Sequence, residues 1–427
     1  MRSQLITTGA IVALTMIYIS GSPAATPDNT GLNAAITMAQ QQNPGLVAAR
    51  ARVEATRSAV KQVSALPDPR LSYTQAVEPV ETRVGPQWQV LSLSQSFPWF
   101  GTLGTRGEAQ NAKADAAAAE VIALSWDLRS SVIEAWWELA HLEQSRTTSQ
   151  DHWVLLSDWE EIARTRYAAG LGAFAEVLKA QIELGILENQ LARLESRRAP
   201  QLAKLNALLN QPLGQSVTVI LPTSVVTLDL DPTTLAAEID AANPRLKAWV
   251  HRAESARAQG RTADKEGWPS LSIGVNWLRH GPARMANVQD DGQDALSATL
   301  SVTLPFRRGQ RRAAVNQAAH QLEAADASLR SIANTLKAEL TRVVFRHDDA
   351  QRSHNLHVRT LIPAARQSLA AVQADYQSGN SSMSELIEVE QTLLDLELGL
   401  ARTDVDLLIA RGQIERLIAR PLDGGTS

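Results

Sequence analysis

The sequence predicts a mainly α-helical protein with a small membrane-embedded β component, to which each chain contributes four strands. Aromatic residues make up only 4% of the 427 residues, a composition typical of long helices with narrow apolar seams. Four short segments instead alternate between apolar and small polar residues, as strands do when one face meets lipid and the other meets water. The same order of motifs also occurs twice along the chain, which indicates an internal duplication.

The N-terminus predicts export. Arg2 precedes an apolar run from Leu5 to Ile19, and a stretch of mostly small residues follows from Gly21 to Ala25. We interpret residues 1–24 as a signal peptide cleaved after Ala24, because the apolar run is too short for a membrane anchor. No later stretch approaches roughly eighteen consecutive apolar residues, so any membrane-spanning part of the mature chain must consist of strands.

Composition excludes several classes of protein. The chain has no cysteine, which excludes disulfides, metal–thiolate sites and the acylated N-terminus of a lipoprotein. A formal net charge of -4 offers no basic surface to phosphate, so we expect no nucleic-acid partner. Neither HExxH, nor GxSxG, nor a phosphate-binding glycine loop occurs, so we predict no enzyme and no cofactor. His354 and His357 could form half of a zinc site, but no third ligand has suitable spacing, and we predict a solvated helix surface there.

The duplication divides the chain. The motif at Asn43-Pro44 recurs at Asn243-Pro244, and the motif at Pro69 recurs at Pro269, both at an offset of 200. Three later pairs are offset by 207 to 209, namely Pro98 with Pro305, Tyr167 with Tyr376, and Asn210 with Ala419. We therefore predict a first repeat at 25–213, a linker at 214–232, a second repeat at 233–422 and a tail at 423–427.

Each repeat has the same predicted plan. A helix, Leu32–Ala65 or Thr234–Lys265, ends at a proline-bearing break and precedes a pair of strands. In the second repeat Leu271, Ile273 and Val275 alternate with small polar residues, which suits lipid on one side and water on the other. Hairpins of an ordinary soluble sheet are the alternative, but the exported chain has no charges on the polar faces of these strands. The predicted strands are 71–77, 88–97, 271–279 and 296–304, with exposed loops at 78–87 and 280–295.

Long helices follow the strands. Between Gly104 and Tyr167 only Gly107 interrupts good helix formers, and a helix over these 64 residues would span about 96 Å. The matching segment of the second repeat, Arg311–Tyr376, contains Pro363, where we predict a kink. The return helix carries apolar residues at every seventh position. The simplest coiled-coil partner is the preceding helix, whose apolar residues have the same seven-residue spacing. The heptad is Leu386, Leu393, Leu400, Leu407 and Ile414, and the matching positions are Leu322, Leu329, Leu336 and Val343.

Four strands cannot close into a barrel by themselves, because the smallest membrane barrels use about eight. Unpaired strand edges in lipid cost several kcal/mol per group, so neighbouring chains must pool their strands. Two copies would give a narrow filled barrel, whereas three would give one with room for a lumen.

Three motifs resemble a known family. The segments LPDP at Leu66, LSQSFPWFG at Leu93 and RYAAG at Arg166 are similar to signatures of the TolC-type outer membrane efflux proteins. The resemblance covers nearly the whole mature chain and is closest to the CzcC-like heavy-metal branch. It implies a homotrimer with a twelve-stranded barrel in outer-membrane lipid and a long periplasmic α-helical barrel. It also implies a periplasmic adaptor protein and an inner-membrane pump, most simply of the RND type, as partners.

In this family the turns between long and return helices form the periplasmic tip, where the pore narrows and the adaptor docks. Those turns are 166–178 and 376–387 here. We expect Gly170 and Gly379 to end helices with positive φ. For Tyr167 and Tyr376, helix-end packing and a gating role remain equal alternatives. The resemblance assigns adaptor docking to Arg166, Tyr167, Gly170, Leu171, Val177, Leu178, Tyr376, Gly379 and Leu386.

Acidic residues mark the expected constriction. Glu385 and Glu388 lie three residues apart on one helix face, where relatives place carboxylates. In a trimer they would form two rings that favour cations, although a solvated helix face is the alternative. Some relatives close the tip with an arginine that pairs with an acid of the other turn. Glu176 matches the acid, but Ser381 stands in place of the arginine, so a hydrogen bond from Ser381 or no equivalent contact is expected.

Two other functions remain open from the sequence. The same architecture serves as the outer membrane duct of a type I protein-secretion system. A soluble periplasmic coiled-coil scaffold is an alternative from a different class.

Overall fold

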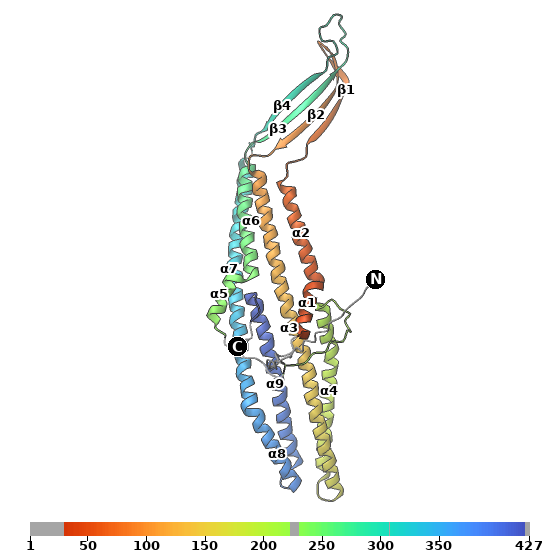
Figure 1. The fold of residues 1–427 in the computed structure, drawn as a ribbon, viewed down its shortest axis with the longest axis vertical. Coiled ribbons are helices and arrows are strands. Elements are labelled where there is room, and N and C mark those ends of the chain that lie inside the picture. The colour runs from red at the N-terminus through yellow and green to blue at the C-terminus, as the bar shows by residue number, and fades with distance from the viewer. Residues whose placement is uncertain (1–29, 223–229, 307, 423–427) are drawn as a thin grey trace, which may run out of the picture.

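The computed structural model describes residues 30–222, 230–306 and 308–422, which form one elongated molecule (Figure 1). A four-stranded sheet stands at one end, and long helices run from it to two helical turns at the other. The predicted signal peptide and the tail lie outside the described residues, as does part of the linker. The first half contains α1 (Thr30–Gln42), α2 (Pro44–Ser64), β1 (Arg70–Thr82), β2 (Gly85–Phe97), α3 (Thr102–Ala168) and α4 (Phe174–Leu208). The second half contains α5 (Pro232–Ala242), α6 (Pro244–Glu266), β3 (Ser270–His280), β4 (Ala295–Thr303), α7 (Arg308–Leu356), the π-helical turn η1 (His357–Leu361), α8 (Ile362–Ser378) and α9 (Met383–Ile418).

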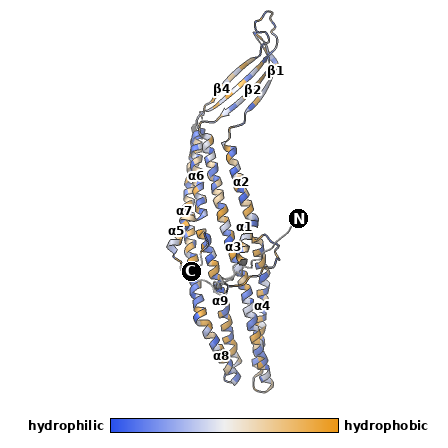
Figure 2. Cartoon of the chain, viewed as in Figure 1, coloured by the Kyte–Doolittle hydropathy of each residue, from blue (hydrophilic) through white to orange (hydrophobic). Residues whose placement is uncertain are grey.

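The strands form one antiparallel sheet in the order β1-β2-β3-β4. The register aligns Leu93 with Val275 in one cross-strand row and Ser92 with Asn276 in the next. One face is therefore apolar and the other small and polar, and the two kinds of residue alternate along the strands in Figure 2. The apolar face is open to the surroundings through Leu71, Tyr73, Leu91, Leu93, Ile273, Val275, Trp277, Leu296, Leu300 and Val302.

The predicted loop at 78–87 is wrong, because most of it continues the strands. β1 extends to Thr82 and β2 begins at Gly85. Pro79 had suggested a loop, but β1 is an edge strand and its register shifts between Gln75 and Val80. Proline is tolerated at such an edge irregularity because no ladder hydrogen bond is lost.

The predicted first helix of each repeat is broken at an asparagine. Asn43 and Asn243 are extended, since the residue before a proline is disfavoured in the helical region. Each side chain then caps the helix that follows, with Oδ1 accepting from the N–H of Gly45 at 3.0 Å or of Arg245 at 2.9 Å. Each amide also donates to the end of a return helix, Asn43 to the Leu208 carbonyl at 3.1 Å and Asn243 to the Leu417 carbonyl at 2.7 Å. The same contact in both halves supports an internal duplication.

The long helices differ between the halves. α3 runs unbroken for 67 residues. In the second half η1 interrupts the helix just before Pro363, and the N–H of Ile362 bonds the His357 carbonyl across this wider turn. Proline cannot donate, so the wider turn accommodates its missing hydrogen bond. The helix changes direction between α7 and α8 near the predicted position (Figure 1). No helix among the residues described combines the length and apolar character needed to cross a bilayer.

Helix α9 packs on the preceding helix, but also on α3. Near the tip, Leu386 and Leu393 share a core with Leu156 of α3 and Leu369 of α8. Higher up, Ile414 packs with Val343 and Leu340 of α7. The predicted partner is therefore only part of the packing, because the first half supplies a second helix to the same seam.

Candidate functional site

The helix that leads into each turn at the tip ends at a glycine with left-handed backbone conformation. Gly170 follows α3 with φ +73°, and Gly379 follows α8 with φ +83°, which confirms the prediction. In each turn the next N–H bonds a carbonyl five residues earlier, Leu171 to Arg166 at 2.8 Å and Asn380 to Asp375 at 2.8 Å. This Schellman arrangement satisfies carbonyls that the helix ends leave free.

Three residues connect the two turns within one chain, and we call them the tip lock. Arg166 Nη1 donates to the Tyr376 carbonyl at 2.7 Å, and the guanidinium carbon lies 4.9 Å from the centre of the Tyr376 ring. The Tyr376 hydroxyl in turn donates to Glu176 Oε2 at 3.3 Å. The tip lock therefore joins the ends of α3 and α8 to the start of α4.

Tyr376 is the buried member of the tip lock, with only 2% of its surface exposed. Burial, reinforced by the Glu176 carboxylate and opposed by Arg166, raises the pKa of Tyr376 from 10.0 to about 12. The phenol therefore stays protonated and keeps its donor at any physiological pH.

Ser381 does not take the place of the missing arginine. Its hydroxyl donates to Glu385 Oε2 at 2.8 Å, within the same turn. The Glu385 N–H is in turn capped by Ser382 Oγ at 3.3 Å. Of the two alternatives, Ser381 therefore makes no contact equivalent to the arginine, and Glu176 accepts from the Tyr376 hydroxyl instead. Glu385 and Glu388 are exposed on the surface of α9.

The apolar and aromatic residues among those expected to dock an adaptor divide into two groups. Tyr167, Leu171 and Leu178 are exposed by 48%, 71% and 43%. Val177 and Leu386 are instead buried, together with Tyr376, in the apolar core near the tip that α3, α4, α8 and α9 share, which we call the tip core. Assigning these three to a docking surface is therefore wrong, since they hold the two hairpins together from inside.

Two contributors to the tip escaped the sequence analysis. Phe174 is 52% exposed, and its ring centre lies 5.3 Å from that of Tyr167. Met383 is fully buried in the tip core. The spacing of Ser382 and Glu385 is that of a capping box, a signal that could have marked the start of α9.

The prediction of a solvated surface for the histidines of α7 and η1 is wrong. His354 Nδ1 lies 2.6 Å from Asp404 Oδ1 of α9, and both side chains are mostly buried. His357 Nδ1 lies 2.7 Å from the Ser353 carbonyl within its own helical segment. The contact with Asp404 arises because this face of the helix packs on α9, which the sequence pattern alone did not indicate.

Comparison with known proteins decides the family. A family model described as outer membrane efflux protein matches residues 35–211 and 235–420, most of the chain. The chain belongs to the outer membrane efflux protein family. It is accordingly an outer membrane channel protein of the Gram-negative type, with a periplasmic helical extension and a role in efflux or secretion. This membership excludes the soluble periplasmic scaffold that the sequence had left open.

Individual relatives are distant, but the matches cover most of both chains. Nodulation protein T from Rhizobium leguminosarum bv. trifolii is 22% identical over 386 residues, which cover 83% of this chain and 77% of the relative. Protein CyaE from Bordetella pertussis is 24% identical over 383 residues, covering 87% and 80%. The crystal structure of the outer membrane protein VceC from Vibrio cholerae aligns with a TM-score of 0.77 at 20% identity, over 92% of this chain and 97% of that one. At this identity the likeness to VceC shows the fold alone.

Proposed function

We propose that three copies of this chain form an outer membrane duct whose periplasmic mouth is narrowed at rest by the tip lock. The observation that carries the proposal is the sheet, which has an exposed apolar face and two open edges, β1 and β4. Pairing β4 of one copy with β1 of the next would give a closed ring of roughly twelve strands, because closure leaves no unpaired edge in lipid. The helices would continue this ring as a periplasmic tube.

The proposed partners are a periplasmic adaptor and an inner-membrane pump of the RND type. Members of the family are trimeric channels that work with adaptors and pumps. The exposed apolar side chains of the first turn, Tyr167, Leu171, Phe174 and Leu178, offer an adaptor a contact surface at the end of the molecule. Such exposed apolar clusters commonly mark protein interfaces.

The proposed cargo is a small cation, such as a heavy-metal ion, as in the CzcC-like branch. In a trimer Glu385 and Glu388 would form two rings of carboxylates near the mouth. Two like charges about 6 Å apart repel by roughly 3 kcal/mol at an effective dielectric near 20, so such rings favour the entry of cations. Their exposure on α9 supports this role.

Conductance in planar lipid bilayers tests this function. The wild-type trimer should form a cation-preferring pore, and Glu385→Ala with Glu388→Ala should reduce the cation preference several-fold. Glu323→Ala is the matched control, because Glu323 is 80% exposed on α7 but lies far from the tip. An anion-selective pore, or no pore, would count against the proposal.

A further inference from the structure

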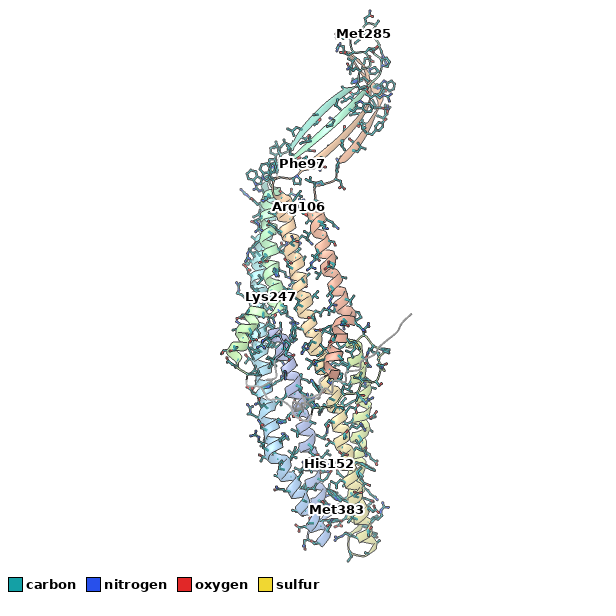
Figure 3. All side chains as sticks on the ribbon, viewed as in Figure 1. Phe97, Arg106, His152, Lys247, Met285 and Met383 are labelled. Carbon is teal, nitrogen blue, oxygen red and sulfur yellow. The ribbon has the colours of Figure 1, made fainter. Side chains whose placement is uncertain are left out.

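A second cluster of charged groups lies above the tip lock, and we call it the helix clasp. His152 of α3 places Nδ1 2.6 Å from Glu390 Oε1 and Nε2 3.1 Å from Glu397 Oε2, both on α9. Arg366 of α8 donates to the other oxygen of Glu397 at 2.7 Å. The clasp therefore joins three helices, at the level where Figure 3 labels His152 above Met383.

The geometry requires a charged imidazole. Each ring nitrogen of His152 faces a carboxylate, so each must carry a proton for both hydrogen bonds to form. The imidazolium and Arg366 then balance the two glutamates. Since His152 and Glu390 are only 6% and 1% exposed, loss of that proton would leave a buried carboxylate without its cation.

The clasp lies in the interface between the two helical hairpins. α3 and α4 form the hairpin of the first half, and α8 and α9 form that of the second half. The two hairpins meet where α3 packs on α9, and His152 with Glu390 lies in that interface. Among the described residues, the contacts that join the two hairpins below the clasp belong to the tip lock and to the lower part of the core around Leu386, so we expect the turns to part by swinging about this level.

We propose that the helix clasp is the fulcrum of opening, with His152 as a positioning residue that holds α3 against α9 while the turns below separate. This inference rests on the proposed function as a duct with a mouth at the tip. It goes beyond that function because it places control of the mouth in a buried ion cluster that contacts no cargo.

The pH dependence separates the clasp from the tip lock. Burial alone would lower the pKa of His152, but the hydrogen bonds and charges of Glu390 and Glu397 outweigh burial and raise it from 6.5 to about 9. The clasp thus contributes in full below pH 6.5 and is lost as pH rises through about 9. Among the described residues, the charged groups facing His152 are these two glutamates, with Arg366 of α8 behind Glu397. Tyr376, with a pKa of about 12, stays protonated in this window.

Spin labels on the two turns test the inference. The chain has no cysteine, so no native residue has to be replaced before labelling. Leu171→Cys and Ser384→Cys, at two exposed positions, place one spin label on each turn. In the full-length trimer in detergent we expect a narrow distance distribution near pH 7 that broadens and lengthens near pH 10. His152→Gln should give the broad distribution at both pH values, whereas His320→Gln, on an 80% exposed side chain, should behave as wild type.

A second variant distinguishes loss of the clasp from misfolding of the chain. His152→Gln with Glu390→Gln removes one charge of each sign and should abolish the pH step in an intact trimer. A wild-type distribution that does not change between the two pH values, or a step that persists in this double variant, would overturn the clasp. Absence of any pore in bilayers would instead remove the duct proposal, and the label distances would still decide the clasp.

Discussion

Arg166 contacts Tyr376 in two ways, through the peptide carbonyl and through the face of the ring. A cation over an aromatic ring and a hydrogen bond each contribute on the order of 1 kcal/mol. Together with the bond from the Tyr376 hydroxyl to Glu176, the tip lock is strong enough to bias the turns together. Under the proposed function, the binding energy of an adaptor would have to exceed that of the tip lock for the turns to part.

Tyr376→Phe should weaken the tip lock without disturbing the core. The ring and its contact with Arg166 remain, while the hydrogen bond to Glu176 is lost. We expect a higher open probability in bilayers by a few-fold, since about 1 kcal/mol corresponds to roughly a fivefold change in an equilibrium. Tyr73→Phe, which removes a hydroxyl from the sheet, is the control. An unchanged open probability would assign Tyr376 to packing alone.

Asn243→Ala should destabilise the trimer more than Asn43→Ala. Both side chains cap a helix and donate to a return helix, but Asn243 is 3% exposed whereas Asn43 is only partly buried. Loss of the cap and of a buried partner should cost about 1–3 kcal/mol at Asn243. Thermal unfolding followed by circular dichroism at one scan rate compares the variants. Equal midpoints would contradict the importance of burial.

At the scale of elements, α9 is the helix on which both halves depend. It packs on α7 and α8 from its own half and on α3 from the other. At Gly412 α9 approaches α3 so closely that an added Cβ would lie 2.8 Å from the Cγ2 of Ile133. The small residue therefore sets the distance between α9 and α3 at this level.

Gly412→Ala should destabilise the chain although alanine is the better helix former. The gain of about 1 kcal/mol in helix propensity is outweighed by the forced shift against Ile133, since overpacking costs typically 1–3 kcal/mol. Gly185→Ala in α4 is the matched control, because nothing lies within 4 Å of its added Cβ. We expect the unfolding midpoint to fall for Gly412→Ala and to hold or rise for Gly185→Ala. A rise of the unfolding midpoint in both variants would show that α3 and α9 can move apart without loss of stability.

At the scale of the whole molecule, the sheet decides where the protein resides. A single chain exposes an apolar face and two strand edges, neither of which is stable in water. Membrane insertion covers the face, and the proposed trimer would pair the edges.

Leu300→Arg should block insertion, whereas Ser301→Arg should be tolerated. The two residues are neighbours on β4, but Leu300 belongs to the apolar face and Ser301 to the polar one. An arginine facing lipid costs roughly 2–4 kcal/mol near the middle of a bilayer, whereas one in a polar lumen costs little. The amount of trimer in the outer membrane fraction measures the difference. Equal loss in both variants would argue against the assigned faces.

Local sequence patterns predicted much of the fold. Alternation placed all four strands, because the period of two depends only on which face is wet. The glycines at 170 and 379 marked the turns, because few other residues adopt positive φ easily. Asn-Pro marked a helix break that could have been predicted, since its cause lies in two adjacent residues.

Only the tertiary structure decided which side chains meet across the two halves. Arg166 with Tyr376, and His152 with Glu390, are separated by more than 200 residues. Their pairing depends on how α3 lies against α8 and α9, and so does the burial of Val177, Leu386 and His354. A sequence determines what each segment can become, because those forces act between neighbours along the chain. The distance and rotation between packed helices arise from many weak contacts at once, and the electrostatics of the tip follow from that packing.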